Sequence, residues 1–260
     1  MSSDASRWEG KIALVTGSSS GAGSEIAREF ARMGAHVAVH CRSNIAAAES
    51  VVESIRREGH AATAFLADLG DTAQVCELAA EVAGRLGPVS ILVNNAGPFS
   101  DTPFLTLRET EWDAVLAVNL KAPFLLSQKM APMMIRKKWG RIINLGATSS
   151  LVRSHSIYGL AKAALVHLTE SLALELAPAV TVNAIVPSQI GSPRTDNMPA
   201  YKNAAITETP MGRLVTEQEV AKMAVCLCAI EFDFMTGRAI VLDGGRTLPR
   251  FPRLRMTSNF

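Results

Sequence analysis

The sequence predicts an α/β protein built as one doubly wound domain, with a seven-stranded parallel sheet and helices on both faces. Short apolar runs of strand length alternate with longer amphipathic stretches along nearly all of the 260 residues. Continuous apolar runs are typical of parallel strands that are buried on both faces. Hydrophobic residues make up 48% of the chain, enough for one large core. No change in composition marks a boundary, so residues 1–260 are expected to form a single Rossmann-type domain.

The strands are predicted where apolar runs rich in Val, Ile and Ala are bounded by turn residues. They are residues 11–16, 35–40, 61–66, 89–93, 141–145, 180–186 and 239–242. The helices are predicted where apolar residues recur at helical spacing, as Ile26, Phe30 and Met33 do in the first of them. They are residues 21–34, 45–58, 71–86, 109–137, 157–177 and 217–229. Glycines at 34, 59 and 87 provide stop signals for the first helices.

Some segments depart from this alternation. Pro123 and Pro132 should bend or divide the helix over 109–137, because proline lacks the N–H group that continues a helix. Residues 191–210 are polar, contain Pro193, Pro199 and Pro210 and show no regular period, so we expect a substrate lid there. Residues 246–260 carry four Arg and no acidic residue. This basic tail is expected either to be disordered or to cross a subunit interface.

Composition argues against several classes of protein. A formal net charge of +2 gives no field that could hold a nucleic acid backbone. No apolar run reaches the ~18 residues that span a bilayer, and the N-terminal residues lack the apolar segment of a secretory signal. The four cysteines are too scattered for a disulfide framework or a zinc site. We therefore expect a cytoplasmic protein that acts on no nucleic acid or membrane and binds no metal.

A glycine-rich turn between the first strand and the first helix predicts a nucleotide site. A pyrophosphate needs backbone N–H groups at close range and the positive end of a helix, and glycine permits that approach because it has no Cβ. The glycines fall at 17, 21 and 23 rather than in the spacing G-x-G-x-x-G of the general fingerprint. The residues expected to bind the dinucleotide here are Gly17, Ser19, Ser20, Gly21, Ala22 and Gly23.

The end of the second predicted strand indicates which dinucleotide binds. An acidic residue there would bond the ribose 2′-hydroxyl of NAD, but the chain reads HCRS at 40–43. A guanidinium at Arg42 would pair with the 2′-phosphate of NADP. Arg42 and Ser43 therefore favour NADP over NAD, unless Arg42 is only a solvated turn residue. Asp68, after the third strand, either accepts a hydrogen bond from the adenine amine or caps the next helix.

Tyr158 and Lys162 form a candidate catalytic pair at the start of a predicted helix. Their i, i+4 spacing places the phenol and the ammonium on one helix face, about 5–6 Å apart at Cβ. A phenol with a pKa near ~10 exchanges protons poorly at neutral pH, whereas a neighbouring cation lowers that pKa. Tyr158 would then exchange a hydroxyl proton while a hydride moves between a nicotinamide and a carbon atom.

These residues belong to a longer series of motifs. The chain contains TGSSSGAG at 16–23, DL at 68–69, NNAG at 94–97, AVNLKAPF at 117–124, GRIINL at 140–145, YGLAK at 158–162, VNAIVP at 182–187 and TGRAIVLDGG at 236–245. With these motifs in this order over residues 10–245, the sequence resembles the short-chain dehydrogenase/reductase family. Within that family it is most similar to the branch of 3-oxoacyl carrier-protein reductases and glucose dehydrogenases.

The resemblance implies roles for the matching positions. It implies that Asn119 bends its helix and holds a water linked to Lys162, which also bonds the nicotinamide ribose. It implies that the backbone of Ile190 meets the nicotinamide carboxamide. The other cofactor-binding positions that it implies are Asp68, Leu69, Asn95, Ala96, Gly97 and Tyr158.

One position departs from the family pattern. Where the family carries a serine that orients the carbonyl oxygen, alignment on GRIINL gives Ala147, and the connection to Tyr158 is shorter. Thr148 or Ser149 would supply the missing hydroxyl if the loop turns inward, although both are also ordinary turn residues. We take Thr148 as a catalytic candidate, and Ala147 and His155 as candidates for substrate contact.

Together these observations predict an oxidoreductase that transfers a hydride between NADP(H) and a ketone or secondary alcohol, with Tyr158 as acid and base. The resemblance implies a homotetramer built from the long helices and the last strand. The turn at 177–179 lacks the arginine typical of carrier-protein reductases, so a carrier-protein substrate is only weakly supported. Two alternatives stay open: a nucleotide-binding protein with little redox activity, because Ala147 replaces the serine, and an NAD-linked alcohol dehydrogenase.

Overall fold

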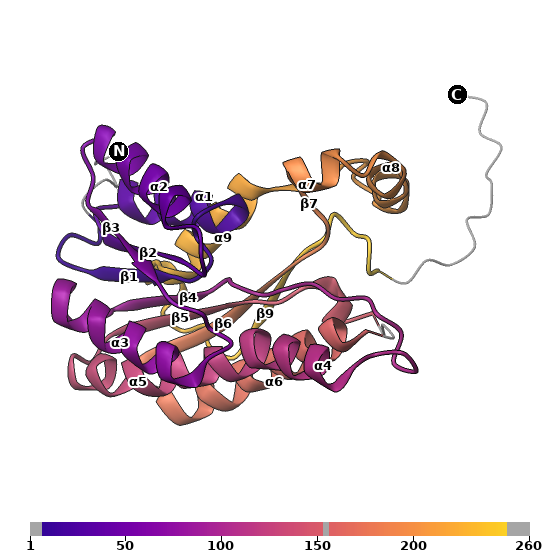
Figure 1. Ribbon diagram of the computed structural model, residues 1–260. Helices are drawn as coiled ribbons and strands as arrows, with labels where there is room; N and C mark the ends of the chain where they lie inside the picture. The colour runs from indigo at the N-terminus through magenta and orange to yellow at the C-terminus, as the bar shows by residue number, and fades with distance from the viewer. Residues whose placement is uncertain (1–6, 153–155, 249–260) are drawn as a thin grey trace.

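A parallel seven-stranded sheet with helices on both faces forms the body of the protein (Figure 1). The structure is a computed structural model that describes residues 7–152 and 156–248. The strand order is β3-β2-β1-β4-β5-β6-β9, and every neighbouring pair runs parallel. The predicted doubly wound α/β fold is therefore confirmed.

The sheet strands are β1 (Ile12–Val15), β2 (His36–Cys41), β3 (Ala62–Leu66), β4 (Ile91–Asn94), β5 (Gly140–Leu145), β6 (Val180–Pro187) and β9 (Ala239–Leu242). The helices are α1 (Gly21–Arg32), α2 (Ile45–Arg57), α3 (Thr72–Leu86), α4 (Glu109–Leu116), α5 (Ala122–Arg136), α6 (Ile157–Leu176), α7 (Pro193–Asp196), α8 (Pro199–Glu208) and α9 (Glu217–Cys228). A separate two-stranded ribbon pairs β7 (Ile190–Gly191) with β8 (Val215–Thr216). Each predicted strand and helix of the main layers appears within a few residues of its expected bounds.

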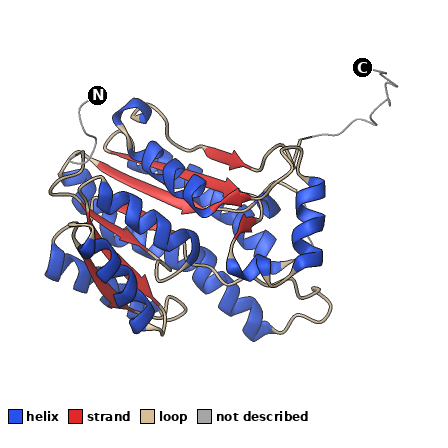
Figure 2. Ribbon diagram, turned by 90° about the horizontal axis from the view of Figure 1, so that it is seen from above, coloured by secondary structure: helices blue, strands red, loops and turns tan. Residues whose placement is uncertain are grey.

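Alternate side chains of the buried strands enter two cores on opposite faces of the sheet. Val15 and Val93 pack with helices α1, α2 and α9, whereas Leu14 and Leu92 pack with α3, α5 and α6. Figure 1 shows these two helical layers on either side of the strands, and Figure 2, seen from above, shows helices lying over the strands. Because both faces are covered, the strands read as continuous apolar runs in the sequence.

The strand order reverses between β1 and β4, which are neighbours although they are far apart in the chain. In doubly wound sheets, ligands bind outside the carboxyl ends of the strands at such a reversal. The glycine-rich turn follows β1 and the NNAG motif includes the end of β4, so both lie at this edge. Helices α7 and α8 extend beyond the sheet from the chain that follows β6 (Figure 1).

The long predicted helix over 109–137 is divided, but one turn earlier than Pro123. Residues Ala117–Lys121 form a π-helical turn between α4 and α5, Pro123 lies in the first turn of α5, and Pro132 is accommodated inside α5. Proline lacks an N–H group, so it is tolerated in a first helical turn. Such single π turns are frequent at functional sites.

The expectation that residues 191–210 lack regular structure is wrong. Helices α7 and α8 occupy most of this segment. Ser192 accepts a hydrogen bond from Thr195 N and the Thr195 side chain in turn accepts one from Ser192 N, which forms a capping box, and prolines begin both helices. The prolines that suggested a loop are therefore helix-start residues. No helix in the described part of the chain is long and apolar enough to cross a membrane.

Candidate active site

The glycine-rich turn is fixed to the end of β2 by a buried histidine. Gly17 N donates to His40 Nδ1 at 3.0 Å, which leaves the proton on Nε2, 2.9 Å from Ala67 O at the end of β3. Ser18 Oγ accepts from His40 N at 3.0 Å and donates to Val15 O at 2.7 Å. Burial lowers the pKa of His40, which favours the neutral ring that these bonds require. This role of His40 is not evident from the sequence.

Asn95 connects the same turn to β4. Its Nδ2 donates to Thr16 O at 2.9 Å and to Gly17 O at 3.1 Å. Gly23 lies so close that a Cβ atom there would overlap Gly17 O and Asn95 Nδ2, and a Cβ at Gly17 would lie 3.0 Å from the Cα of Ala96. The structure thus brings Gly17, Gly23, Asn95 and Ala96 together, as the sequence predicts. It also explains why glycine is needed at 17 and 23: the turn is packed against β4 without room for side chains.

Arg42 and Ser43 directly follow β2 and are both exposed. They lie at the carboxyl edge of the sheet, as the glycine-rich turn does. Asp68 does not cap the next helix. Its Oδ1 accepts from Gly70 N at 2.8 Å, while Asp71 caps α3 by accepting from Ala73 N at 2.8 Å. The alternative interpretation of Asp68 as a helix cap is therefore wrong. Leu69 beside it is buried.

Tyr158 and Lys162 lie in the first turns of α6. Ser156 caps this helix by accepting from Gly159 N at 3.1 Å. Lys162 Nζ lies 5.5 Å from the centre of the Tyr158 ring, so the phenol and the ammonium do share a helix face. The Tyr158 ring makes an edge-on contact with Phe99, with ring centres 5.1 Å apart. Lys162 is buried and donates to Leu145 O at 2.7 Å, and burial lowers its pKa to about 8.

Asn119 occupies the π-helical turn and points toward Lys162. Its Nδ2 donates to Pro98 O at 3.0 Å and to Val115 O at 3.1 Å. Its Oδ1 is buried and forms no hydrogen bond with the residues that the structure describes. A Cβ atom at Gly97 would overlap Asn119 Oδ1 and lie 3.3 Å from Lys162 Nζ. Gly97 therefore lets the amide oxygen and the ammonium approach the same point.

A cavity of about 420 Å³ adjoins this group. The predicted residues in its lining are Asn95, Gly97, Ala147, Thr148, Ser149, Tyr158, Lys162 and Ile190. Arg42 and Asp68 are not in its lining, and His155 lies outside the described residues. Phe99, Asp101 and Gln189 also line the cavity, and none of the three was predicted from the sequence. Gln189 adjoins Ile190, whose backbone was expected to meet the nicotinamide, and that neighbourhood was the available signal.

Helices α7 and α8 also contribute to the lining, through Thr195 and Tyr201, with Met198 between the two helices. Met198 and Tyr201 are partly exposed, at 46% and 43%. The cavity therefore combines an inner group of polar side chains with an outer wall of larger, more apolar ones. A buried lysine, a tyrosine and a mixed cavity beyond the carboxyl ends of β4, β5 and β6 define a site suited to proton transfer on a small bound molecule.

Comparison with known proteins agrees with this site. A family model described as enoyl-(acyl carrier protein) reductase matches residues 17–247. The 3-oxoacyl-[acyl-carrier-protein] reductase FabG of Staphylococcus aureus (strain Mu50 / ATCC 700699) is 36% identical over 239 residues, which are 90% of this chain and 97% of that protein. The chain belongs to the short-chain dehydrogenase/reductase family of oxidoreductases, and the resemblance found in the sequence is confirmed.

Solved structures support the same conclusion. A gluconate 5-dehydrogenase from Burkholderia cenocepacia J2315, in complex with NADP and tartrate, superimposes with a TM-score of 0.87 at 30% identity and covers 96% of this chain and 100% of its own. A blue fluorescent protein from a metagenomic library, in complex with NADPH, gives a TM-score of 0.85 at 28% identity. The match covers 92% of this chain and 98% of that protein.

Proposed function

We propose that the protein is an NADP(H)-dependent carbonyl reductase that interconverts a ketone and a secondary alcohol. The observation that carries this proposal is the placement of Tyr158 and buried Lys162 in one cavity at the edge of the sheet where the glycine-rich turn lies. Related proteins bound to NADP and NADPH share the fold over nearly the whole chain. The cofactor, once bound, supplies or accepts the hydride.

The residues at the sheet edge fit a dinucleotide. The glycines at 17 and 23 let the turn pack closely against the chain after β4, and the N-terminus of α1, which follows directly, favours a negatively charged pyrophosphate. Ser19, Ser20, Gly21 and Ala22 complete this turn. Arg42 and Ser43 would bind a 2′-phosphate, and Asp68 and Leu69 would adjoin the adenine.

Lys162 and Asn119 prepare Tyr158 for proton transfer. In reduction, Tyr158 donates its phenolic proton to the carbonyl oxygen. The ammonium of Lys162 stabilises the phenolate that remains, because an opposite charge nearby favours the ionised form. The unpartnered Asn119 Oδ1 would accept a hydrogen bond from a water that also meets Lys162, which would give the proton a route back to the tyrosine.

The cavity favours an uncharged ketone with an apolar arm. Phe99, Met198 and Tyr201 offer apolar surface, whereas Asp101 would repel a substrate carboxylate. In the lining that the structure describes, Lys162 is the only cation. Ala147 and Thr148 would contact the reacting end of the substrate, and residues 191–210 would act as the lid. A carrier-protein thioester remains the weaker candidate, because 177–179 lacks a basic side chain.

The decisive experiment compares wild type with Tyr158→Phe on a panel of ketones with NADPH. We expect wild type to oxidise NADPH with at least one ketone, and the variant to lose turnover while its Kd for NADPH stays within about threefold of wild type, because the change removes only a hydroxyl group. Tight NADPH binding by wild type without turnover on any ketone would instead support the nucleotide-binding alternative. Unchanged turnover in the variant would refute the role of Tyr158.

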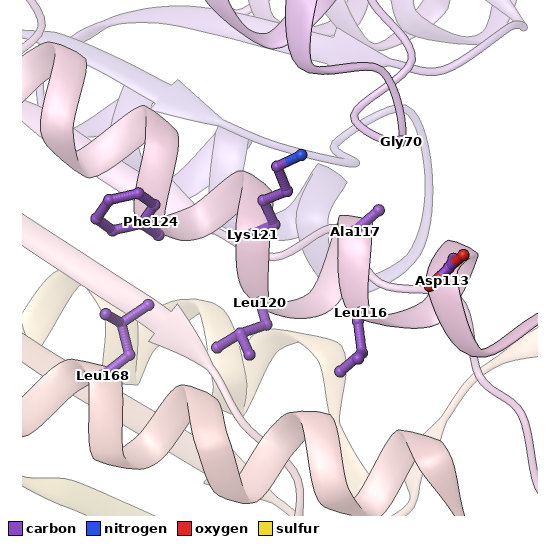
Figure 3. Close-up of a pocket in the computed structure, with 8 residues that line it drawn as sticks. All are labelled: Gly70, Asp113, Leu116, Ala117, Leu120, Lys121, Phe124 and Leu168. Atoms are coloured by element: carbon purple, nitrogen blue, oxygen red, sulfur yellow. The ribbon is translucent and has the colours of Figure 1, made fainter. Parts of the chain in front are cut away.

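We further propose that the protein assembles as a homotetramer. A hollow of about 600 Å³ lies on the outer side of the π-helical turn, α5 and α6, with Leu120, Phe124 and Leu168 around it (Figure 3). Phe124 is 40% exposed and Leu174 on α6 is 86% exposed, and exposed apolar faces of this kind often mark protein contacts. Light scattering should give the mass of four chains, and Phe124→Asp should give smaller species.

A further inference from the structure

Residues 98–102 directly follow the NNAG motif and form neither a helix nor a strand. Within the part of the chain that the structure describes, none of their backbone groups forms a hydrogen bond with the backbone of another segment. Connecting segments of this kind are mobile unless side chains fix them. The position of residues 98–102 therefore depends on the side chains that hold them.

Glu111, in the first turn of α4, is one of these side chains. Its Oε1 accepts a hydrogen bond from Ser100 Oγ at 2.5 Å and another from Thr102 Oγ1 at 2.7 Å. Thr102 N also donates to Ser100 Oγ at 3.3 Å. The hydrogen bonds from the two hydroxyl groups lower the pKa of Glu111, so its carboxylate is ionised at neutral pH. Hydrogen bonds to an ionised acceptor are roughly twice as strong as neutral ones.

Asn119 holds the other end of the segment. This residue lies in the π-helical turn that continues α4, and its Nδ2 donates to Pro98 O at 3.0 Å. Glu111 and Asn119 are eight residues apart in the chain, which corresponds to about 12 Å along a helix. An extended chain covers about 13 Å from residue 98 to residue 102. This match indicates that the segment lies extended along α4, fixed at both ends.

The side chains of this segment divide between two sides, as they do in extended chain. Ser100 and Thr102 bond to Glu111, whereas Phe99 and Asp101 line the cavity that contains Tyr158. The ring of Phe99 contacts the ring of Tyr158 edge-on, with centres 5.1 Å apart. This geometry is attractive for aromatic pairs. The hydrogen bonds on one side of the segment therefore fix, on its other side, the ring that borders the phenol.

We propose that Glu111 is a positioning residue, which keeps Phe99 against Tyr158 and so keeps the phenolic hydroxyl directed at the carbonyl oxygen of the substrate. The proposal rests on ketone reduction as the function of the site. Glu111 does not line the cavity and exchanges no proton with the substrate. It acts through Phe99, because a misplacement of about 1 Å in a reacting group costs up to about 10²-fold in rate.

The test compares Glu111→Ala, Glu111→Gln and Glu109→Ala with wild type in ketone reduction by NADPH. We expect Glu111→Ala to lose about 10–100-fold in kcat, with the Kd for NADPH unchanged. An amide oxygen still accepts hydrogen bonds from both hydroxyls, so Glu111→Gln should recover most of that loss. Glu109→Ala is the matched control, since Glu109 is an exposed acidic residue in the same helical turn and lies outside the cavity lining. Its kcat should stay close to that of wild type.

Phe99→Ala removes the ring through which Glu111 acts. Its kcat should fall by a factor similar to that of Glu111→Ala. The double variant Phe99→Ala/Glu111→Ala should lose little more than Phe99→Ala alone, because residues that act through one contact are not additive. Losses that multiply in the double variant would show that Glu111 acts by another route and would overturn the proposal.

A second readout does not depend on turnover. The chain has two tyrosines, Tyr158 and Tyr201, so protein labelled with fluorotyrosine gives two fluorine resonances, and Tyr158→Phe identifies the one that belongs to Tyr158. The ring of Phe99 affects this resonance because it lies beside the phenol. We expect Glu111→Ala to shift or broaden the Tyr158 resonance, and Glu111→Gln and Glu109→Ala to leave it close to its place in wild type.

The outcomes separate this proposal from the proposed function. If wild type reduces ketones and Tyr158→Phe is inactive, but Glu111→Ala keeps the kcat and the Tyr158 resonance of wild type, the role of Glu111 is wrong and the function stands. A loss in Glu109→Ala as large as that in Glu111→Ala would reflect a general disturbance of α4 and would also overturn the role. If wild type binds NADPH and reduces no ketone, the proposed function fails and the role of Glu111 in the reaction fails with it.

Discussion

The Lys162 ammonium donates a hydrogen bond to the carbonyl oxygen of Leu145 at 2.7 Å, which ties the first turns of α6 to the carboxyl end of β5. Lys162 is buried, and burial lowers its pKa from 10.5 to about 8. A shift of this size corresponds to roughly 3 kcal/mol in favour of the neutral amine. The positive charge of Lys162 at neutral pH is therefore maintained at a cost to stability.

Lys162→Met should stabilise the cofactor-free protein at pH 7 by up to about 3 kcal/mol while abolishing turnover. Below pH 8 both folded and unfolded wild type carry the charge, so its cost is fully present. Between about pH 8 and 10.5 the unfolded state binds more protons, so wild-type stability rises with pH. Urea unfolding at neutral pH and again inside that window should show the gap between the two proteins closing. A variant that is less stable than wild type at neutral pH would contradict this.

Gly97→Ala should damage the site because a Cβ atom there would overlap Asn119 Oδ1 and crowd Lys162 Nζ. We expect a loss of about 1–3 kcal/mol in the free energy of unfolding, typical of overpacking, together with a lower kcat. Gly84→Ala is the matched control, since Gly84 lies exposed inside α3 and a Cβ atom there would have nothing within 4 Å. That variant should gain about 0.5–1 kcal/mol. Equal stability of the two variants would show that the close approach at Gly97 is unimportant.

Arg42→Ser should weaken NADPH binding at least about tenfold, because a charge-assisted hydrogen bond to a phosphate contributes about 1.5–3 kcal/mol. NADH lacks the 2′-phosphate, so its Kd should change little. Fluorescence titration of both nucleotides measures the ratio directly, and Arg57→Ala, at the far end of α2, controls for the loss of a surface charge. Wild-type protein that binds NADH more tightly than NADPH would favour the NAD-linked alternative.

Acid should weaken both the fold and the cofactor site through His40. Burial lowers the pKa of His40 in the folded protein from its ordinary value of 6.5. As the pH falls through 6.5, the unfolded state therefore binds more protons than the folded state. The free energy of unfolding decreases as a result. Protonation of Nδ1 also removes the acceptor for Gly17 N. We expect His40→Asn to lose stability less steeply than wild type in urea unfolding over a pH series that crosses this value.

His36 provides the comparison for this experiment. Burial also lowers its pKa, but its Nε2 contacts Thr63 Oγ1 at 2.9 Å and not the glycine turn. His36→Asn should reduce the pH dependence of stability while leaving the pH dependence of NADPH affinity as in wild type. His40→Asn should reduce both. Identical affinity profiles for the two variants would separate His40 from cofactor binding.

The main layers of the fold could be predicted because their signals are local. Each strand buried on both faces is a short apolar run, and each covering helix has an apolar stripe at helical spacing. Helix α8 has no comparable stripe, because Ala205 is its only buried residue in the part of the chain that the structure describes. Pro199 marks the start of α8 in the sequence, and Ser192 and Pro193 mark the start of α7. In a polar segment, however, these residue types favour a loop equally well.

The sequence by itself determined the order of strands and helices, the glycine-rich turn and the spacing of Tyr158 from Lys162, because each depends on residues that are close in the chain. Only the tertiary structure decided that His40 holds Gly17, that Gly97 leaves room for Asn119 beside Lys162, and that Ser149 rather than Ser150 lines the cavity. These relationships join segments that are distant in sequence or depend on which way one turn faces. They follow from how the strands and helices pack, which no local pattern specifies.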